Sequence, residues 1–467
     1  MENVAYNWLS ELVERCMVQV GEHSSSYGTL KSCRMHDLMR DLCLMKAEEE
    51  NFLQVVNLSS SNISNASPMG KIRRLAIYLD EKADQFVPPR DEAGGGHLRS
   101  LLYFGPNDNY WTAKRKELII PSMFKDFKLL RVLKIEGVEL QEEEEDLELP
   151  SAIGNMVHLR FLSLRQSSIK SFPQFLGNLI CLQTLDFRVQ NDEIVIPNVI
   201  WKMNRLRHLY LPWRYRARGK LQLSTLGDLQ TLDYVSSGCC DLNDVAKLRN
   251  LRKLRIRLES RPWKNLEKIL EAAGSVLNGI RSLRLGNYME SGAEEVMQQI
   301  VARCGQIYKL TLLGSTLELP KEFHSYSNLT KLDLWKCHLK DDQMAKLEKL
   351  PNLKSLGLWA GSLGENTKLL VFSNGSFPRL QFLELFNLEI TEWRVEEGAM
   401  PSLCRLEIKY CLGLSRVPDG VRHLTTLKEL TISEMPREFC SKVEEGGEDF
   451  HKIQHVPSLV IRNPRDD

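Results

Sequence analysis

The chain has 467 residues, more than one compact core usually supports, so we expect either several domains or an array of repeats. Its formal net charge is +1, with 26% of the residues charged, which excludes the strong global field that attracts nucleic acid or an anionic membrane. The eleven cysteines include no C-x-x-C pair, so we expect reduced thiols and neither a disulfide framework nor a zinc site.

The first 50 residues differ from the rest of the chain. Their apolar spacing predicts four elements in order: a helix over 5–16, short strands at 17–20 and 30–35, and a second helix that begins at Asp37. Helix, two strands and helix form the closing part of a winged-helix unit, which we place at residues 1–50. We interpret residues 51–70, which include a stretch rich in serine and asparagine, as a linker.

Residues 71–467 contain an internal repeat in which an apolar residue is followed at positions 4 and 6 by a leucine and a second apolar residue. The leucine at position 4 recurs about sixteen times, at Leu75, Leu101, Leu133, Leu162, Leu185, Leu209, Leu232, Leu254, Leu283, Leu310, Leu332, Leu356, Leu383, Leu406, Leu430 and Leu459. This period is typical of leucine-rich repeats, in which each unit contributes one strand and none folds alone. The sequence therefore predicts an α/β leucine-rich-repeat solenoid, a horseshoe with a parallel sheet on its concave face.

Short turns are predicted on the convex side. Five prolines are each followed by apolar residues at plus three, plus six and plus nine: Pro150, Pro173, Pro197, Pro320 and Pro418. A three-residue period suits a 3₁₀ turn, in which side chains i and i+3 eclipse. Helical patterns predict longer elements only near 264–273 and 292–304.

Candidate chemistry is sparse. Cys337 and Cys411 stand where leucine-rich repeats use asparagine or cysteine to satisfy the turn after the strand. The sequence contains no nucleophile-elbow, phosphate-loop, H-E-x-x-H or dinucleotide-binding pattern, so we predict no catalytic residues, no metal ligands and no enzyme. The N-terminal segment carries acids where a signal peptide needs an apolar core, and no apolar stretch is long enough to span a membrane. We therefore expect a cytoplasmic protein.

The order of these features resembles one known family. The triplet Met35-His36-Asp37 follows the predicted wing, the sequence LMRDLC and an acidic tail come next, and the repeats follow. This order resembles the plant intracellular immune receptors of the NB-ARC leucine-rich-repeat family, most closely their coiled-coil subclass. The resemblance implies that His36 approaches the β-phosphate of ADP when the nucleotide-binding half is present. A helix start favours phosphate, which supports this role. The alternative is that His36 is an ordinary residue of the capping region.

The resemblance also implies partners. A pathogen effector or a guarded host protein would bind the repeats, and the repeats would restrain the receptor's own nucleotide-binding half. ADP or ATP is implied for a full-length receptor, but this sequence contains no G-x-x-x-x-G-K-S/T loop, so we expect no nucleotide on this chain alone.

Two surface patterns could carry these interactions, because side chains at positions 3, 5 and 7 of each strand point outward. A basic stripe occupies these positions in one repeat (Lys253, Arg255 and Arg257), and it could dock the nucleotide-binding half or be only a solvated face. An aromatic row occupies position 7 of three successive repeats: Trp335, Trp359 and Phe386. We interpret the row, assisted by Phe382 and Glu384, as the effector-recognition surface. The alternative is that the rings only pack against one another.

Two other functions could use parts of this architecture. Winged helices often bind DNA, but the predicted first helix carries Glu11 and Glu14, which makes it a poor reader of the major groove, so we expect no nucleic-acid partner. A leucine-rich-repeat substrate receptor or scaffold of ubiquitin ligation would carry an adaptor-binding helical module where this chain has the wing. We keep that function as the alternative.

Overall fold

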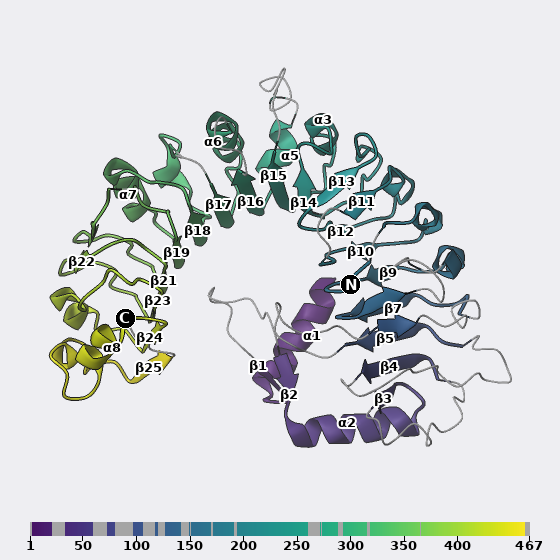
Figure 1. Cartoon of the computed structure of the whole chain (residues 1–467), viewed down its shortest axis with the longest axis horizontal. Coiled ribbons are helices and arrows are strands. Elements are labelled where there is room, and N and C mark those ends of the chain that lie inside the picture. The colour runs from purple at the N-terminus through teal and green to yellow at the C-terminus, as the bar shows by residue number, and fades with distance from the viewer. Residues whose placement is uncertain are drawn as a thin grey trace. The chain divides into compact units, whose positions relative to one another are not determined.

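A computed structural model describes residues 2–20, 33–58, 72–79, 97–105, 117–119, 127–141, 149, 151–169, 171–190, 194–259, 271, 273–287, 293–314, 318–364 and 366–462 (Figure 1). They belong to two compact units. The first comprises Met1–Gln19 with Arg34–Leu254, and the second comprises Val20–Cys33 with Arg255–Asp467. Among the described residues, no helix is long and apolar enough to span a membrane.

The N-terminal residues form the predicted helix, two strands and helix. These elements are α1 (Glu2–Glu14), β1 (Val18–Val20), β2 (Cys33–Met35) and α2 (Asp37–Glu49). The two strands pair with each other, and Arg34 Nε donates a hydrogen bond to Gln19 Oε1 across them at 3.1 Å. The winged-helix prediction is confirmed.

In the first unit, the repeats form a parallel sheet. Its strands are β3 (Gln54–Leu58), β4 (Arg74–Leu79), β5 (Ser100–Phe104), β7 (Val132–Glu136), β9 (Phe161–Ser163), β10 (Thr184–Asp186), β12 (His208–Tyr210) and β14 (Thr231–Ser236). The predicted leucines from Leu75 to Leu232 are register partners, strand after strand. This alignment stacks the repeats so that each buries the leucines of the next.

Residues 54–58 differ from the prediction, because they lie within the predicted linker 51–70 but form β3. This strand pairs with β4 in parallel, and Gln54 is the register partner of Leu75. The β-branched pair Val55-Val56 suits a half-buried strand. The repeat pattern missed the strand because a glutamine replaces the leucine at position 4.

The second unit continues the same pattern. Its strands are β16 (Ser282–Asn287), β17 (Lys309–Leu313), β18 (Lys331–Trp335), β19 (Ser355–Trp359), β21 (Phe382–Phe386), β23 (Arg405–Lys409), β24 (Glu429–Ser433) and β25 (Ser458–Arg462). The predicted leucines from Leu283 to Leu459 again share one register. The remaining strand of this pattern, β15 (Lys253–Leu258), lies where the two units divide. The leucine-rich-repeat fold is confirmed.

Short elements cover the other side of each sheet (Figure 1). The five predicted 3₁₀ turns are confirmed as η2 (Ser151–Asn155), η3 (Gln174–Asn178), η4 (Ile200–Lys202), η5 (Phe323–Ser325) and η6 (Asp419–His423). The predicted helix at 292–304 is confirmed as α6 (Glu294–Ala302), whereas the one at 264–273 lies mostly outside the described residues. Elements that the sequence did not predict are α3 (Leu242–Val245), α5 (Gly274–Gly279), α7 (Asp341–Glu348), α8 (Arg437–Val443) and η7 (Phe450–Lys452).

Three further two-stranded parallel sheets supplement the main sheet. They pair β6 (Glu117–Ile119) with β8 (Glu139–Gln141), β11 (Ile194–Ile196) with β13 (Tyr215–Ala217), and β20 (Leu369–Phe372) with β22 (Glu392–Val395).

Cys337 and Cys411 have the structural role that the sequence indicated. Both are fully buried. The thiol of Cys337 donates to the carbonyl oxygens of Trp335 (3.4 Å) and Leu312 (3.6 Å), so it connects one strand end to the preceding repeat. Burial raises the pKa of the Cys337 thiol to about 12 and that of Cys411 to about 11, which keeps both protonated at neutral pH.

Candidate protein-recognition surfaces

The Met35-His36-Asp37 triplet lies at the start of α2. His36 occupies the N-cap position, where its side chain makes no capping hydrogen bond, and all three side chains are exposed. The described part of α2 buries no residue, and its apolar face includes Leu38, which is 76% exposed, and Leu42. The helix start therefore presents its backbone N–H groups and an imidazole at the surface, as the predicted phosphate contact would require. That role of His36 remains a prediction.

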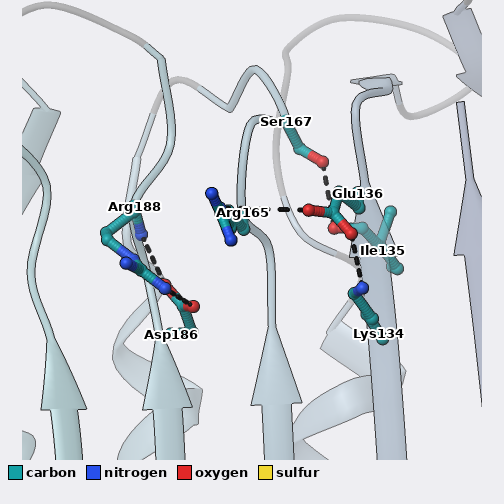
Figure 2. A network of polar contacts seen from close by, with 7 residues as sticks. All are labelled: Lys134, Ile135, Glu136, Arg165, Ser167, Asp186 and Arg188. Atoms are coloured by element: carbon teal, nitrogen blue, oxygen red, sulfur yellow. Dashed lines mark hydrogen bonds and ion pairs between the residues drawn. The ribbon is translucent and has the colours of Figure 1, made fainter. Parts of the chain in front are cut away.

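In the first unit, cations at outward positions are paired with carboxylates on the same face (Figure 2). Lys134 Nζ lies 2.5 Å from Glu136 Oε2, and Arg165 Nε lies 3.9 Å from Glu136 Oε1. Arg188 Nε donates to Asp186 Oδ1 at 2.8 Å. For Lys134 with Glu136 and for Asp186 with Arg188, the signal is opposite charge at positions 5 and 7 of one repeat, whose side chains share a face. Arg165 and Glu136 instead occupy position 7 of neighbouring repeats. Because the partners are so close, this face has a weaker positive field than its arginines alone indicate.

The basic stripe on β15 is smaller than predicted. Lys253 Nζ lies 3.4 Å from Asp233 Oδ2, whose side chain is buried. Arg257 points outward by alternation but is only 6% exposed, and it forms an ion pair with Glu259. Arg255 is half-buried. Arg257 is thus covered despite its outward position, because alternation fixes the direction of a side chain but not what covers it. The partner-binding role of the stripe remains a prediction.

The aromatic row in the second unit is continuous. The ring centroids of Trp335 and Trp359 are 5.5 Å apart and stacked, and those of Trp359 and Phe386 are 5.0 Å apart and tilted. Tyr410, which the sequence did not predict, extends the row with an edge contact to Phe386 at 5.4 Å. All four side chains are half-buried. The rings therefore pack against one another, as the alternative held, and still present part of their surface on the outward face.

Phe382 and Glu384 lie on the same strand as Phe386 but are buried, at 3% and 7% exposure. Phe382 therefore cannot assist recognition as an exposed ring. Burial, reinforced by the neighbouring Glu407 carboxylate and opposed by Lys409, raises the pKa of Glu384 to about 7. Glu384 is thus a carboxyl group beside the aromatic row whose pKa lies near neutral pH.

Comparison with known proteins relates this architecture to one family. A family described as "Leucine-rich repeat region" matches residues 97–446, and "Disease resistance protein Winged helix domain" matches residues 1–43. Two Arabidopsis thaliana proteins, Probable disease resistance RPP8-like protein 2 and Disease resistance protein RPP8, are each 34% identical to this chain, over 469 and 471 residues. Each alignment covers 99% of this chain and 49% of the relative. The chain belongs to the plant disease resistance proteins.

This disease resistance chain spans about half the length of the curated relatives that it matches, and it corresponds to their winged-helix and leucine-rich-repeat regions. A solved structure of a leucine-rich-repeat protein from Leptospira interrogans aligns with 86% of the chain and 93% of its own length. Its TM-score is 0.51 and its identity 18%, which shows the fold alone. This family membership favours the disease resistance prediction over the alternative of a substrate receptor or scaffold in ubiquitin ligation.

We expect this region of the resistance protein not to bind ADP by itself. His36 and one helix start offer too few donors to hold a diphosphate against water, and the sequence contains no phosphate loop. Calorimetric titration of the chain with millimolar ADP should show no saturable heat. A micromolar dissociation constant would contradict this expectation.

Proposed function

We propose that this chain is the recognition and restraint part of a cytoplasmic plant immune receptor, and that the outward face of β18 to β23 recognises a pathogen effector or a guarded host protein. The observation that carries the proposal is the continuous row of Trp335, Trp359, Phe386 and Tyr410. Aromatic side chains gathered on an outward face are unusual in a protein without partners. Tryptophan and tyrosine are also the residue types most enriched among interface hot spots.

The double substitution Trp335→Ala and Trp359→Ala, in a complete receptor rebuilt around this chain, should abolish effector-dependent cell death. Loss of a tryptophan hot spot weakens binding by at least about 2 kcal/mol, roughly thirtyfold in affinity. Because both rings are half-buried and lie outside the leucine core, the melting midpoint should fall by only a few degrees.

The control is Trp213→Ala, which removes a tryptophan that is 38% exposed and lies outside the aromatic row, and which should leave the response intact. A stable double variant that still responds would remove the row from recognition. A double variant that melts many degrees lower would place the two tryptophans in the core.

The second part of the proposed function is restraint of the receptor's nucleotide-binding half by β15. Arg255 is, like Lys253, a half-buried member of the basic stripe, and its reversal leaves Lys253 and Arg257 themselves unchanged. A cationic strand face favours an acidic partner surface, and charge complementarity mainly sets association rate and register.

Replacing Arg255 with glutamate should therefore cause cell death without effector, and should remove the salt dependence of association between this chain and the nucleotide-binding half in trans. Arg249→Glu reverses an exposed arginine outside the stripe and should have neither effect. If Arg255→Glu leaves both the resting state and the salt dependence unchanged, β15 is only a solvated face.

A further inference from the structure

Beside the aromatic row lies a row of carboxylates at position 5 of the same repeats. Asp333 lies on β18, Glu384 on β21 and Glu407 on β23. Glu384 and Glu407 are register partners on neighbouring strands, which brings their backbones to about 4.8 Å and sets two acids side by side. Between Asp333 and Glu384 the register position belongs to Gly357, which contributes no side chain of its own.

The protein's own cations compensate these acids unevenly. Lys409 Nζ lies 2.6 Å from Glu407 Oε1 but 3.9 Å from Glu384 Oε1. Lys331 Nζ lies 3.7 Å from Asp333 Oδ1. Three carboxylates thus face two lysines, and the most buried of the three has the longest ion pair. At outward positions 3, 5 and 7, the intervening β19 contributes no charged side chain.

The acidic and aromatic rows meet at Gly357. A Cβ atom at that position would lie 2.6 Å from Trp359 Nε1 and 3.0 Å from Asp333 Oδ1, so the indole edge and the carboxylate fill the space above the glycine. The buried indole N–H of Trp359 has no hydrogen-bond partner within the described structure. An aromatic ring, a carboxylate and an unused donor therefore converge over one residue of the sheet.

We propose that this acid–aromatic junction (Asp333, Gly357, Trp359, Glu384 and Glu407) binds an arginine side chain of the receptor's protein partner. The proposal rests on the proposed recognition function and names the chemistry that the recognition face selects. A guanidinium is planar, pairs with carboxylates through two parallel hydrogen bonds and stacks on indole rings. A lysine offers only a point charge, so it should bind more weakly.

The probe that tests the junction is N-acetyl-arginine amide, added to the whole chain labelled with 5-fluorotryptophan. The fluorine resonance of Trp359, assigned with Trp359→Phe, should shift saturably at millimolar probe. N-acetyl-citrulline amide has nearly the same shape without the charge and should cause no saturable shift. Glu384→Gln should weaken arginine binding about tenfold or more, since it removes a charge-assisted pair. The matched control Glu389→Gln, on an exposed glutamate, should leave binding unchanged.

Arginine binding should also depend on pH. Only the ionised Glu384 attracts a cation, so affinity should rise as the pH increases through about 7, the pKa of Glu384. Burial is the main cause of this raised pKa, and the charged groups that modify it are Glu407 and Lys409 on β23 and Asp333 and Lys331 on β18. Glu384→Gln should remove the rise.

Equal shifts with citrulline and arginine would overturn the proposal, as would unchanged arginine binding in Glu384→Gln. If that variant fails to fold by circular dichroism, the citrulline comparison and the pH dependence of the unsubstituted chain decide the matter. If arginine does not bind but the double tryptophan variant loses the immune response, the proposed recognition function stands and the acid–aromatic junction is not an arginine-binding site. If arginine binds while the double tryptophan variant still responds, the proposed recognition function is wrong but the junction is an arginine-binding site.

Discussion

Replacing Lys452 with methionine is expected to lower the free energy of unfolding by about 3–5 kcal/mol, the range measured when one partner of a buried ion pair is removed. Lys452 ends η7 and is only 5% exposed. Its Nζ lies 2.7 Å from Asp449 Oδ1 and 2.9 Å from Asp419 Oδ1, and it donates to the carbonyl oxygen of Val417 at 2.8 Å. Methionine keeps the length of the side chain but leaves the buried Asp449 carboxylate without its cation.

The pKa shifts of this cluster define the pH range of the effect. Burial lowers the pKa of Lys452, but the hydrogen bonds to Asp449 and Asp419 outweigh it, so the net pKa lies above the ordinary 10.5. The lysine's contribution is therefore complete below pH 10.5 and is lost as the pH rises through the folded pKa. The hydrogen bond from Lys452 lowers the pKa of Asp419 below 3.8, so its contribution is lost only in acid. Asp419 is 76% exposed, so screening makes Asp449 the main partner.

Denaturant unfolding followed by circular dichroism measures this loss, with Lys442→Met as the matched control. Lys442 pairs with the exposed Glu438 at 2.6 Å, and solvent screening leaves such surface pairs with little effect on stability. Adding Asp449→Asn to Lys452→Met should recover part of the loss, because it removes the uncompensated charge. If Lys452→Met costs no more than Lys442→Met, the cluster does not stabilise this end of the chain.

The second large effect is expected from Leu383→Ala, which should cost about 2–5 kcal/mol through lost burial and the cavity left behind. Leu383 is fully buried and lies in register between Leu356 and Leu406 on the neighbouring strands. The repeats cannot close the gap easily, because each strand is held at both edges by its neighbours. The midpoint and slope of urea unfolding measure the loss.

The control for this substitution is Leu412→Ala, because Leu412 is 53% exposed and its loss should cost well under 1 kcal/mol, as is usual for surface positions. Equal losses for the two variants would mean that the leucine at position 4 of the repeat is not the core residue that the register indicates.

The sequence predicted the repeating parts of the fold because they rest on local, strict spacing. The recurrence of leucine at position 4 of each repeat placed Leu332, Leu356 and Leu383 in one register. Each proline that is followed by apolar residues at a three-residue period marked a 3₁₀ turn. β3 was missed because Gln54 stands where the pattern requires leucine.

The candidate surfaces were predicted less completely. The direction of a side chain follows from its position in its own strand, whereas its burial depends on residues that are distant in the sequence. Alternation correctly aimed Trp335 and Trp359 outward, but it could not show that Arg257 and Phe382 are covered by their surroundings. Tyr410 was missed because it lies just after the end of β23, where the alternation of the strand no longer applies. Tyr410 itself has a left-handed backbone conformation, with φ of 54°, and its ring packs against Phe386.

The excess of acids beside the aromatic row was also missed. Asp333, Glu384 and Glu407 lie in three separate repeats, and only the register brings them to one face. Nothing in the spacing of charges along the chain indicates that Lys409 lies closer to Glu407 than to Glu384.

The central claim is that the outward face of β18 to β23 contacts the recognised protein. Its most direct test is photo-crosslinking from benzoylphenylalanine placed at Phe386 or Tyr410 in the complete receptor, with Leu412, an exposed residue outside the row, as the control position. We predict that a crosslinked product containing the effector or guarded protein forms from positions 386 and 410 only when the effector is present, and does not form from position 412. Products from position 412 alone, in a receptor that still responds, would contradict the account.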